Sequence, residues 1–115
     1  MPAAPLPPPA PPALRVIVAA PPTEPGTVAL LEAALAQAGD GASVSVLFSE
    51  AGLDALLGDW PARLHAAGVH TSLCARSARA RRLDPAALPR TVLWSSLTSL
   101  LSDAGPAARL WTVVA

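Results

Sequence analysis

The sequence predicts an α/β domain, a three-layer α/β/α sandwich built around a mostly parallel five-stranded sheet. Short apolar runs of strand length alternate along its 115 residues with segments of helical periodicity. Aromatic residues make up only 3% of the chain, although 52% of it is hydrophobic. We therefore expect a core of alanine, leucine and valine, in which alanine-rich helices pack closely on the sheet.

The first third of the chain contains a proline-rich tail, one strand and one helix. Residues 1–13 are mostly Pro and Ala and are expected to be disordered or polyproline-like, which leaves residues 14–115 as the folded domain. Residues 14–20 form a continuous apolar run, typical of a strand buried on both faces. A proline-rich loop follows, because proline cannot continue a strand. Thr27 is the expected N-cap of a helix over residues 27–39.

The alternation of strands and helices continues to the end of the chain. Further strands are expected at residues 43–49, 69–75, 91–96 and 109–115. The helical stretches between them cover residues 50–59, residues 60–68, the arginine-rich segment after residue 75, and residues 97–105. Right-handed crossovers make the sheet largely parallel, and ligands gather at the carboxyl ends of such strands. That edge is expected to hold Ser49 and Glu50, Cys74 to Arg76, and Ser95 with Ser96.

The only cysteine of the chain is the best candidate for a reactive group. Cys74 ends the third expected strand and is followed by Arg76, Arg79 and two further arginines. Backbone amides at the start of a helix and nearby guanidinium groups both lower the pKa of a thiol. We expect Cys74 to be catalytic, Arg76 and Arg79 to stabilise its anion, and Ser95 to line an adjoining pocket. The alternative is that Cys74 is a small buried hydrophobe beside a solvated arginine-rich helix.

Other kinds of site find little support in the sequence. His70 lies four positions before Cys74 on the same strand, about 13 Å away at about 3.3 Å per residue, and His65 precedes the opposite end of that strand, so no imidazole base is expected. One cysteine and two scattered histidines give no zinc spacing. Nucleotide-binding glycine motifs are absent, and no aromatic residues interleave with the arginines. We expect no cofactor, no metal and no direct nucleic-acid binding.

The cellular setting follows from the cysteine count and from hydropathy. A single cysteine cannot form an internal disulfide, and the amino terminus lacks the basic start and apolar helix of a signal peptide. No run of about 18 uninterrupted apolar residues is present, so no membrane span is predicted. We expect a cytoplasmic protein.

A thiolate without a base or a cofactor can still act as a carrier. It attacks the terminal sulfur of a persulfide, holds it as Cys–S–SH, and yields it to another thiol. This exchange requires a lowered pKa and access rather than a catalytic triad.

The stretch around Cys74 resembles the DsrE-like sulfur-relay family, which includes the subunits of the Tus complex. The family pattern is a strand that begins with Gly-Val, then the cysteine, a small residue four positions later, and an Arg-Gly-aliphatic ending. In this chain the corresponding residues are Gly68, Val69, Cys74, Ala78, Arg81, Arg82 and Leu83.

The resemblance extends over residues 14–115. VLFSEAGLDALL resembles the second strand of the family and its glycine turn, at Gly52, and LWSSLTSLLSDAG resembles the fourth strand and last helix, with Ser95 at the strand end. The chain departs from the pattern at Arg82, where the family has glycine. Since arginine enters the left-handed conformation far less readily, the turn after the helix is not expected to follow the family pattern. It also has Ala108 where many members carry aspartate.

The resemblance implies a parallel α/β sheet and a sulfurtransferase that carries a persulfide on Cys74. It also implies sulfur donor and acceptor proteins as partners, and a homo- or hetero-oligomer, often a trimer or hexamer. The alternative is a non-catalytic subunit or partner-binding module with a buried, inert thiol. A small-molecule or nucleotide-binding domain that uses the same strand edge is a third option.

Overall fold

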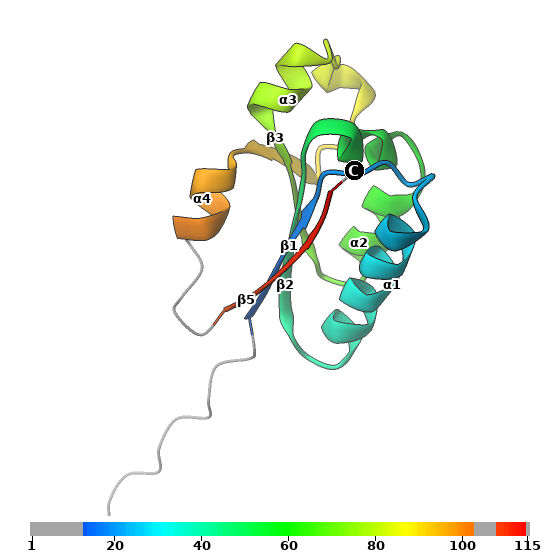
Figure 1. Ribbon diagram of the computed structural model, residues 1–115, viewed down its shortest axis with the longest axis vertical. Helices are drawn as coiled ribbons and strands as arrows, with labels where there is room; N and C mark the ends of the chain where they lie inside the picture. Colours follow the sequence, from blue (N-terminus) through cyan, green and yellow to red (C-terminus); the bar gives the residue numbers. More distant parts are fainter. Residues whose placement is uncertain (1–12, 103–107, 115) are drawn as a thin grey trace, which may run out of the picture.

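The structure is a computed structural model that describes residues 13–102 and 108–114. Its centre is a five-stranded sheet in the order β4-β3-β2-β1-β5, and every neighbouring pair of strands is parallel (Figure 1). The strands are β1 Ala13–Val18, β2 Ser43–Phe48, β3 His70–Cys74, β4 Val92–Ser95 and β5 Arg109–Val113. The predicted α/β fold with a five-stranded sheet is confirmed.

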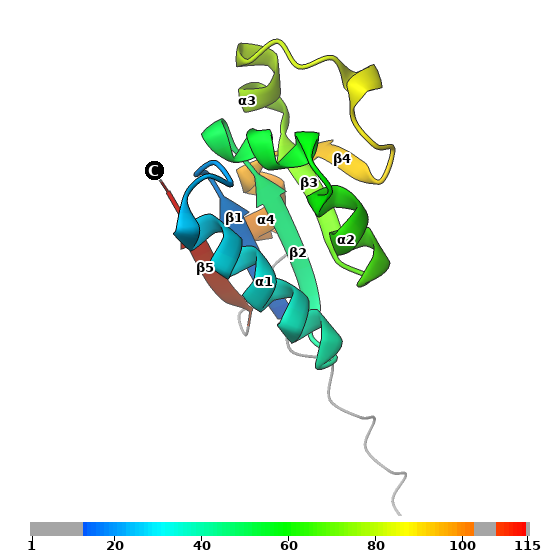
Figure 2. The same cartoon turned by 90° about the vertical axis from the view of Figure 1, so that its right-hand side faces the viewer.

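Helices lie on both faces of the sheet, but the two layers are unequal. The helical elements are α1 Pro25–Gly39, η1 Glu50–Leu57, α2 Trp60–Ala66, α3 Ala75–Ala80, η2 Pro85–Ala87 and α4 Leu97–Ser102. Figures 1 and 2 show α1 and α2 against one face of the sheet and the short α4 against the other, while α3 stands beyond the end of β3. The α4 side of the sheet is therefore the more open one.

The core lies between the sheet and the two helices α1 and α2. In β1 the side chains of Leu14, Val16 and Val18 are fully buried, whereas Arg15 and Ile17, which alternate with them, are only half-buried. The expectation that this strand is buried on both faces therefore holds for one face. The other face is partly open because one six-residue helix is its principal cover.

The first two helical segments differ in detail from the sequence-based expectation. Helix α1 begins at Pro25, because proline suits the first turn of a helix, and Glu24 is its N-cap. Thr27 is therefore not the cap: it is fully buried inside the first turn, and its hydroxyl donates to the carbonyl oxygen of Ala20 at 3.2 Å. The second segment, η1, is a 3₁₀ helix that ends at Leu57, with Gly58 as its C-cap.

Part of the expected structure lies outside the described residues. The parts outside them are the proline-rich tail up to residue 12, the end of the last predicted helix from residue 103, and residue 115 of the last predicted strand. Ala13, assigned to the tail, belongs to β1. Within the described ranges, no helix has the length and apolar character needed to cross a bilayer.

Candidate functional site

The carboxyl ends of β2, β3 and β4 meet at one edge of the sheet. Cys74 ends β3 and is paired in register with Ser95, the last residue of β4. Ser49 directly follows β2, and its backbone N–H donates to the carbonyl oxygen of Val18 at 2.8 Å. The parallel pairing therefore places residues that are distant in sequence beside the thiol, as the sequence analysis expected for this edge.

The thiol of Cys74 is free and half-buried. Burial raises its pKa, but hydrogen bonds from the Ser77 hydroxyl, the backbone N–H groups of Ser77 and Arg76, and the Ser49 hydroxyl outweigh burial. The net result is a pKa below the ordinary value of a cysteine. Cys74 precedes the short helix α3, whose first backbone N–H groups have no partner within the helix and so are free to point at the sulfur.

A polar network connects the thiol to a carboxylate. The hydroxyls of Ser49 and Ser77 are 3.3 Å apart, and the Ser77 hydroxyl donates to Oε1 of Glu50 at 3.2 Å. Ser77 is 5% exposed, so its single hydroxyl proton is distributed among these partners and Cys74 with little competition from water. The Ser77 hydroxyl therefore lies between the sulfur and the Glu50 carboxylate.

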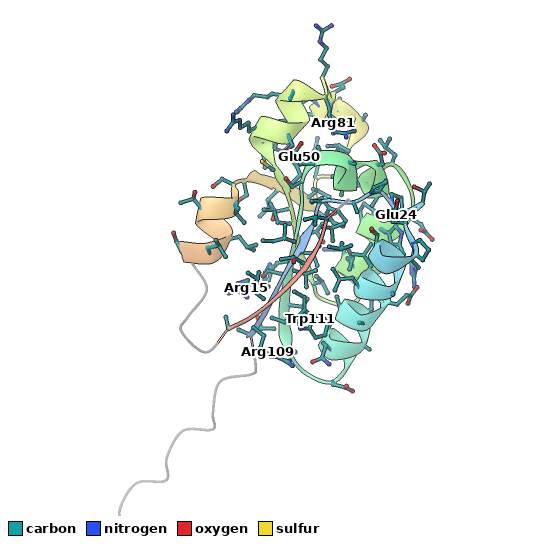
Figure 3. The ribbon with its side chains drawn as sticks, in the orientation of Figure 1. Arg15, Glu24, Glu50, Arg81, Arg109 and Trp111 are labelled. Carbon is teal, nitrogen blue, oxygen red and sulfur yellow. The ribbon has the colours of Figure 1, made fainter. Side chains whose placement is uncertain are left out.

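The backbone around Glu50 is strained because the chain turns sharply after β2. Glu50 has a φ of 50°, in the left-handed region that glycine favours. Two residues later, a Cβ on Gly52 would lie 2.0 Å from the carbonyl oxygen of Val18, so only glycine fits there. Because η1 packs tightly against the end of β1, the chain turns sharply at Glu50. This turn places the Glu50 carboxylate beside Ser77. Figure 3 shows Glu50 close to the base of α3.

The arginines after Cys74 were expected to stabilise its anion through their side chains. Arg76 and Arg79 are exposed on α3. Arg76 acts on the Cys74 pKa through its backbone N–H, and no guanidinium group is among the causes of the shift in the described residues. Arg81 forms an ion pair with Asp54 at 3.5 Å. Hydroxyls and backbone amides, rather than arginine side chains, surround the sulfur.

The two histidines lie far from the thiol. His70 begins β3, at the opposite end of the strand from Cys74, and His65 is exposed in the last turn of α2. In the described part of the chain, no three His, Cys, Asp or Glu side chains lie together in a way that would hold a metal ion. The thiol therefore has hydroxyl neighbours but no imidazole.

A cavity of about 310 Å³ lies on the α4 side of the sheet. Ser95, the register neighbour of Cys74, lines it, as do Ser72 of β3 and Ser99 of α4. Arg15, Ser45 and His70 line the part nearer the amino ends of the strands. Ser95 thus joins the cavity to the strand end that carries the thiol.

Ser49 and Glu50 lie at the edge that the sequence predicted for them, although no role was predicted for either, and Ser77 was not a predicted site residue. One signal was available: Ser77 follows Cys74 by three residues at the start of a helix, which brings its hydroxyl back toward the preceding turn. The contact between Ser77 and Glu50 depends on β2 and β3 being neighbours, which no local pattern shows.

Fold and site together define a small α/β protein with a parallel five-stranded sheet and one thiol of lowered pKa at the carboxyl edge of that sheet. No model of a known protein family matches the chain, and no curated protein is similar to it in sequence. Among solved structures, the crystal structure of the ychN protein from E. coli is similar, with a TM-score of 0.76 and 17% sequence identity. The similarity covers 90% of this chain and 100% of the ychN chain. At this identity the likeness shows a shared fold.

Proposed function

We propose that this protein is a sulfur carrier that accepts the terminal sulfur of a persulfide on Cys74 and passes it to another thiol. The observation that carries the proposal is the hydrogen bonding around Cys74. Two hydroxyls and two backbone N–H groups act on a half-buried sulfur and lower its pKa despite burial. This arrangement favours the thiolate, which is the nucleophile in sulfur exchange.

The transfer needs neither an oxidant nor a base. The Cys74 thiolate attacks the outer sulfur of a donor R–S–SH, a new S–S bond forms, and the old S–S bond breaks. The donor leaves as the thiolate R–S⁻, and Cys74 becomes Cys–S–SH. A second thiolate repeats the attack on the outer sulfur and restores Cys74. The donors around Cys74 would hold each anionic sulfur in turn.

The proposal includes the wider setting that the sequence suggested. Sulfur donor and acceptor proteins would be the partners, the chain would work as a homo- or hetero-oligomer, and the reducing cytoplasm would keep the thiol available. Arg76 and Arg79, exposed on α3 next to the thiol, would meet an acidic surface of a partner rather than the sulfur itself.

The direct test uses intact mass. Incubation with a persulfide donor is expected to add about 32 mass units, the mass of one sulfur atom, and an excess of acceptor thiol is expected to remove them. Because the chain has one cysteine, Cys74→Ser removes every thiol and must abolish the gain. Ser43→Ala, at the exposed start of β2 and far from the thiol, is the control and should keep it.

An unchanged mass, together with a thiol that is alkylated only in denaturant, would contradict the carrier. That result would favour the non-catalytic subunit.

A further inference from the structure

The cavity on the α4 side runs along the same sheet face that carries the Cys74 side chain. His70, Ser72 and Cys74 alternate on one face of β3, and Ser95 occupies the same-face position opposite Cys74. Ser72 and Ser95 line the cavity. The residues that border Cys74 along its strand and across to β4 therefore form one end of this cavity.

The other end of the cavity is a polar row across three strands. Arg15, Ser45 and His70 are aligned in register on β1, β2 and β3, and all three line the cavity. Arginine is always charged and presents several N–H donors, which suit a carboxylate. Among the described residues, Arg15 and His70 are the ionisable groups of the lining. Figure 3 shows Arg15 on the side of the sheet that faces α4.

The distance between the two ends restricts the size of a ligand. From the row of Arg15 to the row of Cys74 is four residues, or about 13 Å at about 3.3 Å per residue. A hydrogen-bonded contact at the polar end takes up about 3 Å, which leaves about 10 Å. In a tripeptide with its thiol on the central residue, an extended γ-glutamyl arm places eight bonds between the terminal carboxyl carbon and the sulfur, which span about 10 Å at about 1.25 Å per bond. Thiosulfate is far too short to reach both ends.

We propose that this cavity binds a small anionic thiol persulfide of tripeptide size, with its carboxylate at Arg15, Ser45 and His70 and its outer sulfur at Cys74. This inference rests on the proposed sulfur-carrier function and names its donor class as a low-molecular-weight persulfide rather than a protein. The serine hydroxyls of the lining would bind the peptide groups between the two ends. Attack by the Cys74 thiolate transfers the outer sulfur and releases the ligand as its thiolate.

The binding test is independent of sulfur chemistry. S-Methylglutathione, an unreactive tripeptide of the proposed length, is expected to bind the full chain, as measured by calorimetry. Arg15→Gln should weaken binding about tenfold or more, because it removes a charge-assisted hydrogen bond. Arg90→Gln, at an exposed arginine outside the cavity lining, is the matched control and should bind as the wild type does. If Arg15→Gln does not fold, Ser99→Phe, which fills the cavity from an exposed position on α4, should weaken binding instead.

The kinetic test separates this inference from the proposed function. With glutathione persulfide, the mass gain at Cys74 should saturate with concentration, and Arg15→Gln should raise the half-saturating concentration about tenfold or more while leaving alkylation by neutral iodoacetamide unchanged. With thiosulfate, Arg15→Gln should have no effect.

Two outcomes overturn the inference and leave the proposed carrier function intact. One is sulfur uptake that neither Arg15→Gln nor Ser99→Phe changes, and the other is uptake from a protein persulfide only. If Cys74 takes up no sulfur from any donor, the carrier fails, and binding of S-methylglutathione alone decides whether the cavity holds this ligand class. Absence of that binding overturns the inference.

Discussion

At the residue scale, the reactivity of Cys74 depends on how one hydroxyl proton is shared. Ser77 has a single proton to donate, and Glu50 accepts it at 3.2 Å. While that proton points at the carboxylate, it cannot form a hydrogen bond to the sulfur. The negative charge of Glu50 also disfavours a thiolate nearby. We therefore expect Glu50 to raise the pKa of the thiol relative to a site without it, in opposition to the hydrogen bonds that lower it.

Replacing Glu50 with glutamine tests this competition. Glu50→Gln removes the charge and the stronger acceptor, so the Cys74 pKa should fall further and more thiolate should be present at neutral pH. Ser77→Ala removes a donor, so the pKa should rise. The ultraviolet absorbance of the thiolate, titrated with pH, measures both shifts. A higher thiol pKa in Glu50→Gln would show instead that the carboxylate helps to deprotonate the thiol through Ser77.

At the element scale, the turn that ends the short helix α3 contains a residue in an unfavourable backbone conformation. Arg82 has a φ of 55°, so the chain makes the left-handed turn for which the DsrE-like pattern has glycine. The backbone N–H of Leu83 donates to the carbonyl oxygen of Ala78 at 3.0 Å, which satisfies a helix-end carbonyl. Arginine thus keeps the turn at an energetic cost that glycine would avoid.

Arg82→Gly should stabilise the protein by about 1 kcal/mol, because glycine adopts the left-handed conformation without the Cβ clash. Urea unfolding measures the change. Ala80→Gly, two residues earlier in the last turn of α3, should act in the opposite direction, since glycine weakens a helical position. Equal destabilisation by both substitutions would contradict the strained turn.

Local patterns predicted β3, Cys74 and the helix after it, because an apolar run, a helical segment and their junction are all contiguous in sequence. Local sequence patterns do not show which residues of different strands are in contact. Ser77 contacts Glu50 only because β2 and β3 are neighbours. His70, which the sequence excluded as a base for Cys74, lines one cavity with Arg15 only because of the order of three strands. Thr27 was misassigned because Pro25 starts the helix earlier.

At the scale of the whole molecule, the α4 side of the sheet exposes an apolar surface. Leu97 and Leu101, one turn apart on α4, are 44% and 45% exposed, while Leu100 of the same helix is buried. Leu93 of β4 and Leu110 of β5 are 63% and 49% exposed. Leu93 and Leu110 lie on the two edge strands of the sheet, with α4 between them. Exposed leucines on one side of a molecule are typical of surfaces that meet another protein chain.

We expect this surface to join copies of the chain. Light scattering should give a solution mass that is a multiple of 11.6 kDa. The double substitution Leu97→Glu with Leu101→Glu should lower that mass, because it places like charges in an apolar contact. Leu57→Glu, at a leucine 65% exposed in η1, is the control and should leave the mass unchanged. A monomeric wild type would refute the expectation.

The most direct measurement is the pH dependence of the alkylation of Cys74 by iodoacetamide in the folded protein. Hydrogen bonds from serine hydroxyls and backbone N–H groups favour the thiolate, so the rate should rise with pH around a midpoint below that of a free cysteine. In denaturant the midpoint should return to that value. A folded protein that reacts only after unfolding, or with a midpoint above that of free cysteine, would contradict a reachable thiolate at the edge of the sheet.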